Sequence, residues 1–128
     1  MLEEIYTNNA PEPIGPYSQA IKNNGFIFLS GQIPINPETN KIESENISDQ
    51  AKQVFKNIAE ILNESNTSFN KVVKTTIFLT DLNNFNIVND IYSSYFNNDT
   101  PPARSTIEVS SLPMKSLIEI ELIVCDEK

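Results

Sequence analysis

The sequence contains no histidine, one cysteine and three glycines among its 128 residues. Without histidine, neither a Ser–His–Asp triad nor a histidine-based metal site can form, and a single cysteine excludes thiolate zinc sites. The glycines, Gly15, Gly25 and Gly31, cannot build a glycine-rich phosphate loop. Any catalysis must therefore use carboxylates, tyrosines, hydroxyls, backbone amides or arginine, and we expect no metal and no cofactor.

Positive charge is also scarce, because nine Lys and Arg residues stand against seventeen Asp and Glu, for a formal net charge of −8. A nucleic-acid surface needs clustered Lys and Arg, so we expect no nucleic-acid partner. No apolar run of about 18 residues and no signal-peptide pattern occurs, which predicts no membrane partner. The one cysteine, Cys125, cannot form an internal disulfide, and this favours a cytoplasmic location.

Hydrophobic periodicity predicts strands and helices in one domain spanning residues 1–128, with no internal repeat or linker. The stretches 7–16 and 34–46 are rich in polar residues and proline, which predicts loops. The expected strands are 17–22, 26–31, 71–81, 104–110 and 118–125, and the expected helices are about 48–62 and 84–96. This order indicates an α+β sandwich with two helices on one face of a sheet.

Alternation within the strands assigns side chains to the two sheet faces. In 71–81, Val73 and Thr75 are expected on the same face. Arg104 and Thr106 are expected on the uncovered face together with Glu119. That face also carries apolar residues such as Phe78 and Ile123, so leaving it in water would be costly. We therefore expect oligomerisation through this face, which would place its charged groups in a partly dry setting.

Several stretches, in order along the chain, resemble the motifs of one family: "IGPYSQA", "LSGQIP", "KTTIFLTDLNNFNIVNDIY", "PARS" and "IEIE". They are similar to the Rid family of reactive intermediate (imine) deaminases, also called YjgF-type proteins. The resemblance implies a chorismate-mutase-like fold, with a six-stranded mixed sheet, two helices on one face and the last strand inside the sheet. It also implies a homotrimer with sites in clefts between subunits.

Active members of that family hydrolyse 2-imino acids, formed from enamines released by pyridoxal-phosphate enzymes, to 2-oxo acids and ammonia. The resemblance implies 2-iminopropanoate and 2-iminobutanoate as substrates. Thr106 stands where the family often has cysteine, and Pro101 where it often has an aromatic residue. The resemblance implies that Arg104 and Glu119 are catalytic and that the substrate is bound by Tyr17, Ser30, Gly31 and Asn89. Thr106, at the position of the family's cysteine, is also expected among the substrate-binding residues.

The chemistry of these residue types suits the implied reaction. An arginine fork binds a carboxylate in a bidentate manner, and a glutamate can position water and shuttle a proton. Glu121, on the same strand face as Glu119, is a rival for the second role. One alternative is a non-catalytic trimer that binds a 2-oxo acid or related metabolite through Arg104, although a second carboxylate would repel that anion. A third alternative is a ribonuclease or translation inhibitor, which the net charge of −8 and the lack of interleaved aromatic and basic residues disfavour.

Overall fold

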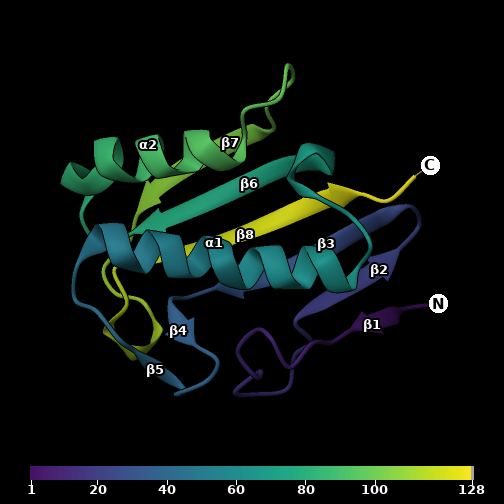
Figure 1. Ribbon diagram of the computed structural model, residues 1–128, viewed down its shortest axis with the longest axis horizontal. Coiled ribbons are helices and arrows are strands. Elements are labelled where there is room, and N and C mark those ends of the chain that lie inside the picture. The colour runs from purple at the N-terminus through teal and green to yellow at the C-terminus, as the bar shows by residue number, and fades with distance from the viewer. Residues whose placement is uncertain (128) are drawn as a thin grey trace.

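A six-stranded mixed sheet lies behind two α-helices in the computed structural model, which describes residues 1–127 (Figure 1). The helices are α1 (Ile47–Glu64) and α2 (Phe85–Tyr95). A separate small hairpin interrupts the loop expected over 34–46 and pairs β4 (Ile35–Asn36) with β5 (Lys41–Ile42). The strands of the main sheet are β1 (Glu3–Ile5), β2 (Ala20–Asn23), β3 (Phe26–Gln32), β6 (Val72–Leu79), β7 (Ala103–Glu108) and β8 (Ile118–Cys125).

The strand order is β1-β2-β3-β8-β6-β7, and every neighbouring pair is antiparallel except β6 and β7. Helix α2 makes the crossover between these two parallel strands (Figure 1). Strand β8 lies between β3 and β6, which confirms the expected sheet with its last strand inside. Strand β1 did not emerge from hydrophobic periodicity, because it has three residues and only Ile5 is buried.

Helix α1 begins where the polar segment before it supplies a cap. The Asn46 side chain accepts hydrogen bonds from the backbone N–H groups of Ser48 (2.8 Å) and Asp49 (3.2 Å), which satisfies two donors at the helix start. The apolar stripe of the helix then faces the sheet, and Phe55 is fully buried there. Its ring stacks on Tyr95 of α2 with centroids 4.5 Å apart. The core therefore lies between the two helices and one face of the sheet.

A β-bulge in β6 changes which side chains reach this core. The pairing of β6 with β8 shifts between Val72 and Lys74, so that Val73 is an extra residue in the strand. Val72 is buried, whereas Val73 is 42% exposed. The expectation that Val73 shares the face of Thr75 is therefore wrong. Beyond the bulge the alternation is regular, and the residues from Thr75 to Leu79 alternate as predicted.

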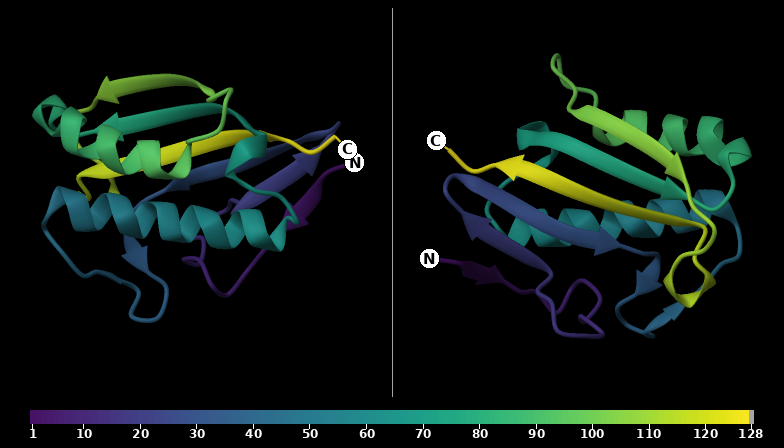
Figure 2. Two further views of the ribbon diagram at one scale, coloured as in Figure 1. Left: turned by 45° about the horizontal axis from the view of Figure 1, so that its top comes forward. Right: turned by 180° about the vertical axis from the view of Figure 1, so that it is seen from behind.

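Among residues 1–127, no α-helix covers the opposite face of the sheet (Figure 2). Phe28 and Ile107 are 44% and 45% exposed on this uncovered face, and Phe78 and Ile123 are only partly covered. The partly apolar face inferred from the sequence is thus present. No helix within residues 1–127 combines the length and apolar character needed to cross a membrane.

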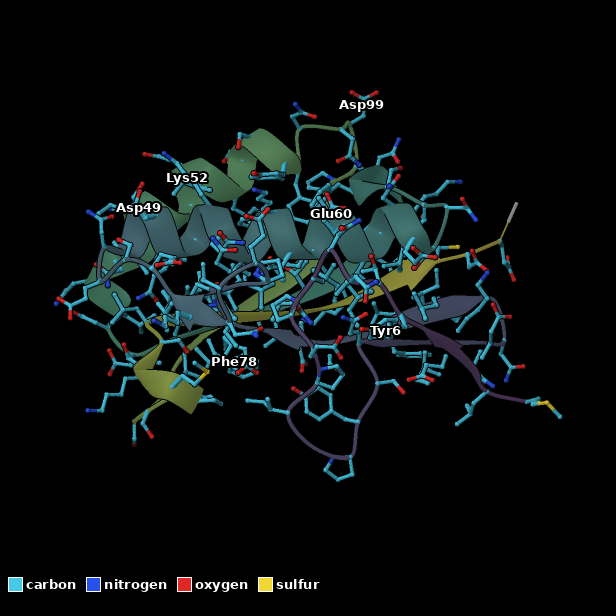
Figure 3. The ribbon with its side chains drawn as sticks, turned by 60° about the horizontal axis from the view of Figure 1, so that its bottom comes forward. Tyr6, Asp49, Lys52, Glu60, Phe78 and Asp99 are labelled. Atoms are coloured by element: carbon cyan, nitrogen blue, oxygen red, sulfur yellow. The ribbon has the colours of Figure 1, made fainter. Side chains whose placement is uncertain are left out.

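Side-chain polarity separates the two sides of the molecule. Asp49, Lys52 and Glu60 extend from α1 on the side of the helix away from the sheet, and Phe78 lies on the other side of the sheet (Figure 3). The outer helix surface is thus charged, whereas the uncovered sheet face exposes aromatic rings. Exposed aromatic clusters of this kind are typical of surfaces that another protein covers.

Candidate functional site

Strand β7 places Arg104 and Thr106 on the helix-covered face of the sheet. Arg104 is in register with Thr75 of β6, and Thr106 with Ile77. Residues in register point to the same face, and Thr75 and Ile77 are buried beneath the helices. The expectation that Arg104 and Thr106 lie on the uncovered face is therefore wrong. The alternation in β7 was correct, but its apolar residue, Ile107, faces the uncovered side, opposite to the usual assignment.

Neutral groups surround Arg104. Its Nη1 donates a 2.8 Å hydrogen bond to Oδ1 of Asn89 on α2. The guanidinium carbon lies 4.7 Å from the ring centroid of Tyr92 and 5.4 Å from that of Phe85, within cation–π range. Across residues 1–127, no Asp or Glu lies within ion-pair distance of Arg104. The position of the guanidinium is therefore fixed while its charge is left without a counter-ion.

The Tyr92 ring beneath this guanidinium is itself held in place. Its hydroxyl forms a 2.8 Å hydrogen bond with Oγ1 of Thr75, and both residues are buried. Burial raises the pKa of the Tyr92 phenol above its ordinary value, while the Thr75 hydrogen bond and the Arg104 charge act in the opposite direction. The ring is therefore neutral, as well as fixed, under ordinary conditions.

Thr106 follows Arg104 on the same face but does not offer a free hydroxyl. Its Oγ1 is buried and has no hydrogen-bond partner among the described residues. Neither solvent nor a small ligand reaches this oxygen in the single chain without movement of its neighbours. A buried unpaired hydroxyl costs stability, so this position is a weak point of packing.

A cleft of about 480 Å³ lies next to Glu119. We call it the glutamate cleft; its lining includes Tyr17, Ser30, Gly31 and Glu119, with apolar walls from Ile33, Ile35 and Pro113. The cleft opens where β3 departs from regular pairing with β8, since the register shifts between Leu29 and Gln32. Bulges of this kind often re-aim side chains at functional sites.

Gly31 is required by the position of the Glu119 carboxylate. A Cβ at position 31 would lie 2.7 Å from Cδ of Glu119, closer than real contacts allow. The absent side chain thus lets the carboxylate lie directly against the backbone of the β3 bulge. This close approach, rather than a turn, explains glycine here, because Gly31 has no positive φ.

The Glu119 carboxyl has a pKa above its ordinary value. Burial is the larger cause, and the negative charge of Glu121 adds to it. Glu119 is half-buried, whereas Glu121 is exposed. A raised carboxyl pKa is common where a group takes up and releases protons, so Glu119 fits this chemistry better than its rival.

Ser30 joins the cleft to the loop that precedes β2. Its Oγ donates a 2.5 Å hydrogen bond to the carbonyl of Ser18, and its N–H donates to the carbonyl of Gln19 at 2.9 Å. The hydroxyl proton is therefore engaged, while its lone pairs can still accept. Tyr17 lies just before this attachment and is half exposed. Strand β2 begins only at Ala20, later than the sequence predicted.

Gln19, which the sequence pattern did not single out, fixes this loop. Its buried side chain accepts a 2.8 Å hydrogen bond from the N–H of Thr7. Its amide donates to the carbonyls of Thr7 (3.0 Å) and Pro11 (2.9 Å). One side chain thus orders the loop that carries Tyr17 and walls the cleft. In the sequence, Gln19 is a polar residue between the loop "APEPIGP" and a strand. An ordinary surface glutamine would give the same pattern, so the sequence did not identify this role.

The predicted site residues therefore form two groups that one chain does not bring together. Arg104 of β7 is in register with Thr75 of β6, which is in turn in register with Leu122 of β8. Glu119 of β8 is instead in register with Phe78 of β6. The two levels differ by three residues on β8, about 10 Å along a strand, and the side chains point to opposite faces. Tyr17, Ser30, Gly31 and Glu119 share the glutamate cleft, and Asn89 and Thr106 lie with Arg104.

The topology places the molecule in the chorismate-mutase-like class of α+β proteins, here with two helices on one face of six strands. A family model described as Endoribonuclease L-PSP matches residues 7–125. The chain belongs to this family, which also includes the Rid and YjgF proteins.

Two relatives and one solved structure show how similar other members of the family are to this chain. A RutC family protein of Pyrococcus horikoshii is 50% identical over 127 residues, covering 99% of this chain and all of the relative. Reactive Intermediate Deaminase A of Arabidopsis thaliana is 51% identical over 121 residues, covering 94% of this chain and 64% of the relative. A crystal structure of a Rid family protein of unknown function from Yersinia pestis superposes with a TM-score of 0.95, at 52% identity, with 98% and 99% of the two chains covered.

Proposed function

We propose that the protein is a hydrolytic deaminase of 2-imino acids, with 2-iminopropanoate and 2-iminobutanoate as substrates. One relative, 51% identical, is named a reactive intermediate deaminase, which supports deamination at the level of the family. The observation that carries the proposal is the state of Arg104. It is the only arginine of an acidic chain, is held by Asn89, and has no carboxylate partner among residues 1–127.

Arg104 binds the substrate carboxylate in this proposal. A guanidinium fixed on one side by an amide oxygen and an aromatic face keeps further N–H donors for a bidentate pair. The pair orients the C=N carbon for attack. Lysine would supply the charge but not the fork, so the arginine is specific to a planar anion.

Glu119 acts on water and on the leaving nitrogen. As a carboxylate it accepts a proton from water while the water oxygen bonds to C2 and the C=N π electrons move to nitrogen. It then returns this proton to nitrogen, which gives a neutral carbinolamine. As the C–N bond breaks, the hydroxyl proton passes through Glu119 to the departing nitrogen, so that the products are the 2-oxo acid and ammonia. Its raised pKa suits both directions of transfer.

We further propose that the complete site forms between copies of the chain in a homotrimer. Arg104 of one copy would face the glutamate cleft of its neighbour, because a single chain holds the two groups on opposite sheet faces. The exposed rings of Phe28 and of other residues on the uncovered face supply an apolar surface for this association. Sedimentation equilibrium that gives a stable monomer at micromolar concentration would refute this arrangement.

The decisive experiment is complementation between two inactive variants. Arg104→Ala and Glu119→Gln are refolded together and assayed with a dehydratase that releases the transient imine, while 2-oxo acid formation is followed. In a statistical mixture of trimers, about a quarter of the sites would combine the intact arginine of one copy with the intact glutamate of another. Equal turnover in the mixture and in the separate variants would overturn the intersubunit site.

A non-catalytic trimer that binds 2-oxo acids through Arg104 is the main alternative, because the same anchor serves both functions. The coupled assay separates the two: binding of 2-oxobutyrate without acceleration of imine hydrolysis supports the alternative. The carboxylate of Glu119 favours catalysis, since it would repel a bound anion that needs no chemistry. The description of the matched family names a ribonuclease, but the net charge of −8 disfavours RNA as a ligand.

A further inference from the structure

We infer that Asn89 is a positioning residue, whose neutral oxygen holds Arg104 while leaving its positive charge free for a ligand carboxylate. The inference rests on the proposed function, in which Arg104 binds that carboxylate. It gives Asn89 a different role from the direct substrate contact that the family resemblance implies. Asn89 acts through Arg104 and needs no contact with the substrate.

The geometry supports an indirect role. Oδ1 of Asn89 accepts from Nη1 of Arg104 at 2.8 Å, which fixes one of the five guanidinium N–H donors. Asn89 lies in the middle of α2, so its backbone is rigid, and its side chain is half-buried against β7. An amide at this place orients the fork as a carboxylate would, but without neutralising it.

The chemical choice at position 89 matters because a carboxylate is the common partner of a half-buried arginine. The next residue, Asp90, is acidic but exposed, and it makes no ion pair with Arg104. An acid at position 89 would form a charge-assisted pair with Nη1, and an incoming carboxylate would then have to compete with it. The other close neighbours of the guanidinium, Tyr92 and Phe85, are also uncharged rings.

Two substitutions at one position separate positioning from ordinary packing. Asn89→Asp keeps the shape and the hydrogen bond but adds the competing charge, whereas Asn89→Ala removes the contact and leaves Arg104 unneutralised. Calorimetry with 2-oxobutyrate should show affinity reduced by about tenfold or more in Asn89→Asp and by only a few-fold in Asn89→Ala. The midpoint of thermal unfolding should be equal or higher for Asn89→Asp than for the wild type.

Asn97→Asp is the matched control, because it adds the same charge at an exposed position just beyond α2 and should leave affinity unchanged. If Asn89→Ala weakens binding as much as Asn89→Asp, or if neither weakens it, the inference is wrong. Arg104→Ala distinguishes this failure from failure of the proposed function. If Arg104→Ala binds 2-oxobutyrate normally, Arg104 does not bind the carboxylate and the proposed function is wrong. If Arg104→Ala loses binding but Asn89→Asp binds normally, Arg104 keeps its role and only the inference about Asn89 is wrong.

Discussion

Within residues 1–127, neither Arg104 nor Glu119 has a counter-ion, although both side chains are partly buried. The protein supports the two groups differently. Arg104 is gripped by a hydrogen bond and two rings, so its geometry is fixed and its charge is free. The Glu119 carboxylate lies in the space that the absent side chain leaves at Gly31. Burial and the negative charge of Glu121 oppose its ionisation. Arg104 supplies a fixed positive charge, and Glu119 supplies a carboxyl group with a raised pKa. Such unpaired, partly buried groups are typical of functional sites rather than of contacts that stabilise a fold.

The largest effect on turnover is expected at Glu119, because this side chain transfers the protons in the proposed reaction. Glu119→Gln keeps size and polarity but cannot take up a proton, so turnover should fall by a factor on the order of 10²–10⁴. Binding of 2-oxobutyrate should persist or tighten, because a repulsive charge is removed. The coupled imine assay beside calorimetry checks both. Normal hydrolysis by this variant would make Glu119 structural and pass its role to Glu121 or to a water held by backbone groups.

Substitution of Arg104, in contrast, should act mainly by weakening ligand binding. Arg104→Ala forfeits a charge-assisted pair, so 2-oxobutyrate binding should weaken by roughly 2–5 kcal/mol and turnover should fall with it. Arg104→Lys should restore only part of the loss, because a point charge cannot replace the fork. Calorimetry with all three proteins tests the order, and full recovery with lysine would show that only charge matters at this position.

Gly31→Ala should sharpen the contrast by moving Glu119 without altering its chemistry. The new methyl group displaces the carboxylate, so we expect turnover to fall by about tenfold or more, while the side chain can swing aside and the fold persists. Gly25→Ala is the control: Gly25 has φ +81°, so alanine there should lower the unfolding midpoint and spare turnover. Unchanged turnover in Gly31→Ala would mean that the observed carboxylate position is not the catalytic one.

A smaller effect is expected from Glu121→Gln, seen in the pH dependence. Glu119 must be ionised to accept a proton, so turnover should decline as pH falls through its raised pKa. Removing Glu121 lowers that pKa towards its ordinary value, and the acidic limb should shift to lower pH. Because the pKa of Glu119 is raised in the native state, that state loses stability as Glu119 ionises. Glu121→Gln should therefore also stabilise the protein slightly at neutral pH. If the acidic limb of the pH profile does not move in Glu121→Gln, that limb does not report the ionisation of Glu119.

The smallest effect is expected at Thr106. Thr106→Val replaces an unpaired buried hydroxyl by a methyl group, so turnover should stay near that of the wild type. The free energy of unfolding should be unchanged or higher by up to about 1 kcal/mol, measurable by urea denaturation. A loss of turnover like that of Arg104→Ala would show that the hydroxyl contacts the substrate in the assembled site.

The fold was predictable where periodicity was strong. Both helices and the long strands follow from regular apolar spacing. The exceptions were local. Strand β1 is too short to carry a pattern, and the bulge at Val73 adds a residue that alternation cannot foresee.

The site was harder to predict, for a physical reason. Alternation shows which residues share a face but not which face the helices cover. In β7 the apolar Ile107 faces the uncovered side, so hydrophobicity alone assigned Arg104 wrongly. The neutral setting of Arg104 and the close approach of Glu119 to Gly31 depend on contacts between distant segments. These contacts become visible only in three dimensions.

The central place of β8 has a consequence for how the chain acquires its structure. During synthesis, β8 is the last strand of the sheet to leave the ribosome, yet both β3 and β6 pair with it. Until residues 118–125 are available, the hairpin of β2 and β3 shares no sheet hydrogen bonds with the parallel pair β6 and β7. Such long-range pairing slows folding and leaves strand edges open to aggregation. The sheet is therefore expected to form only after the strand in its middle has been made.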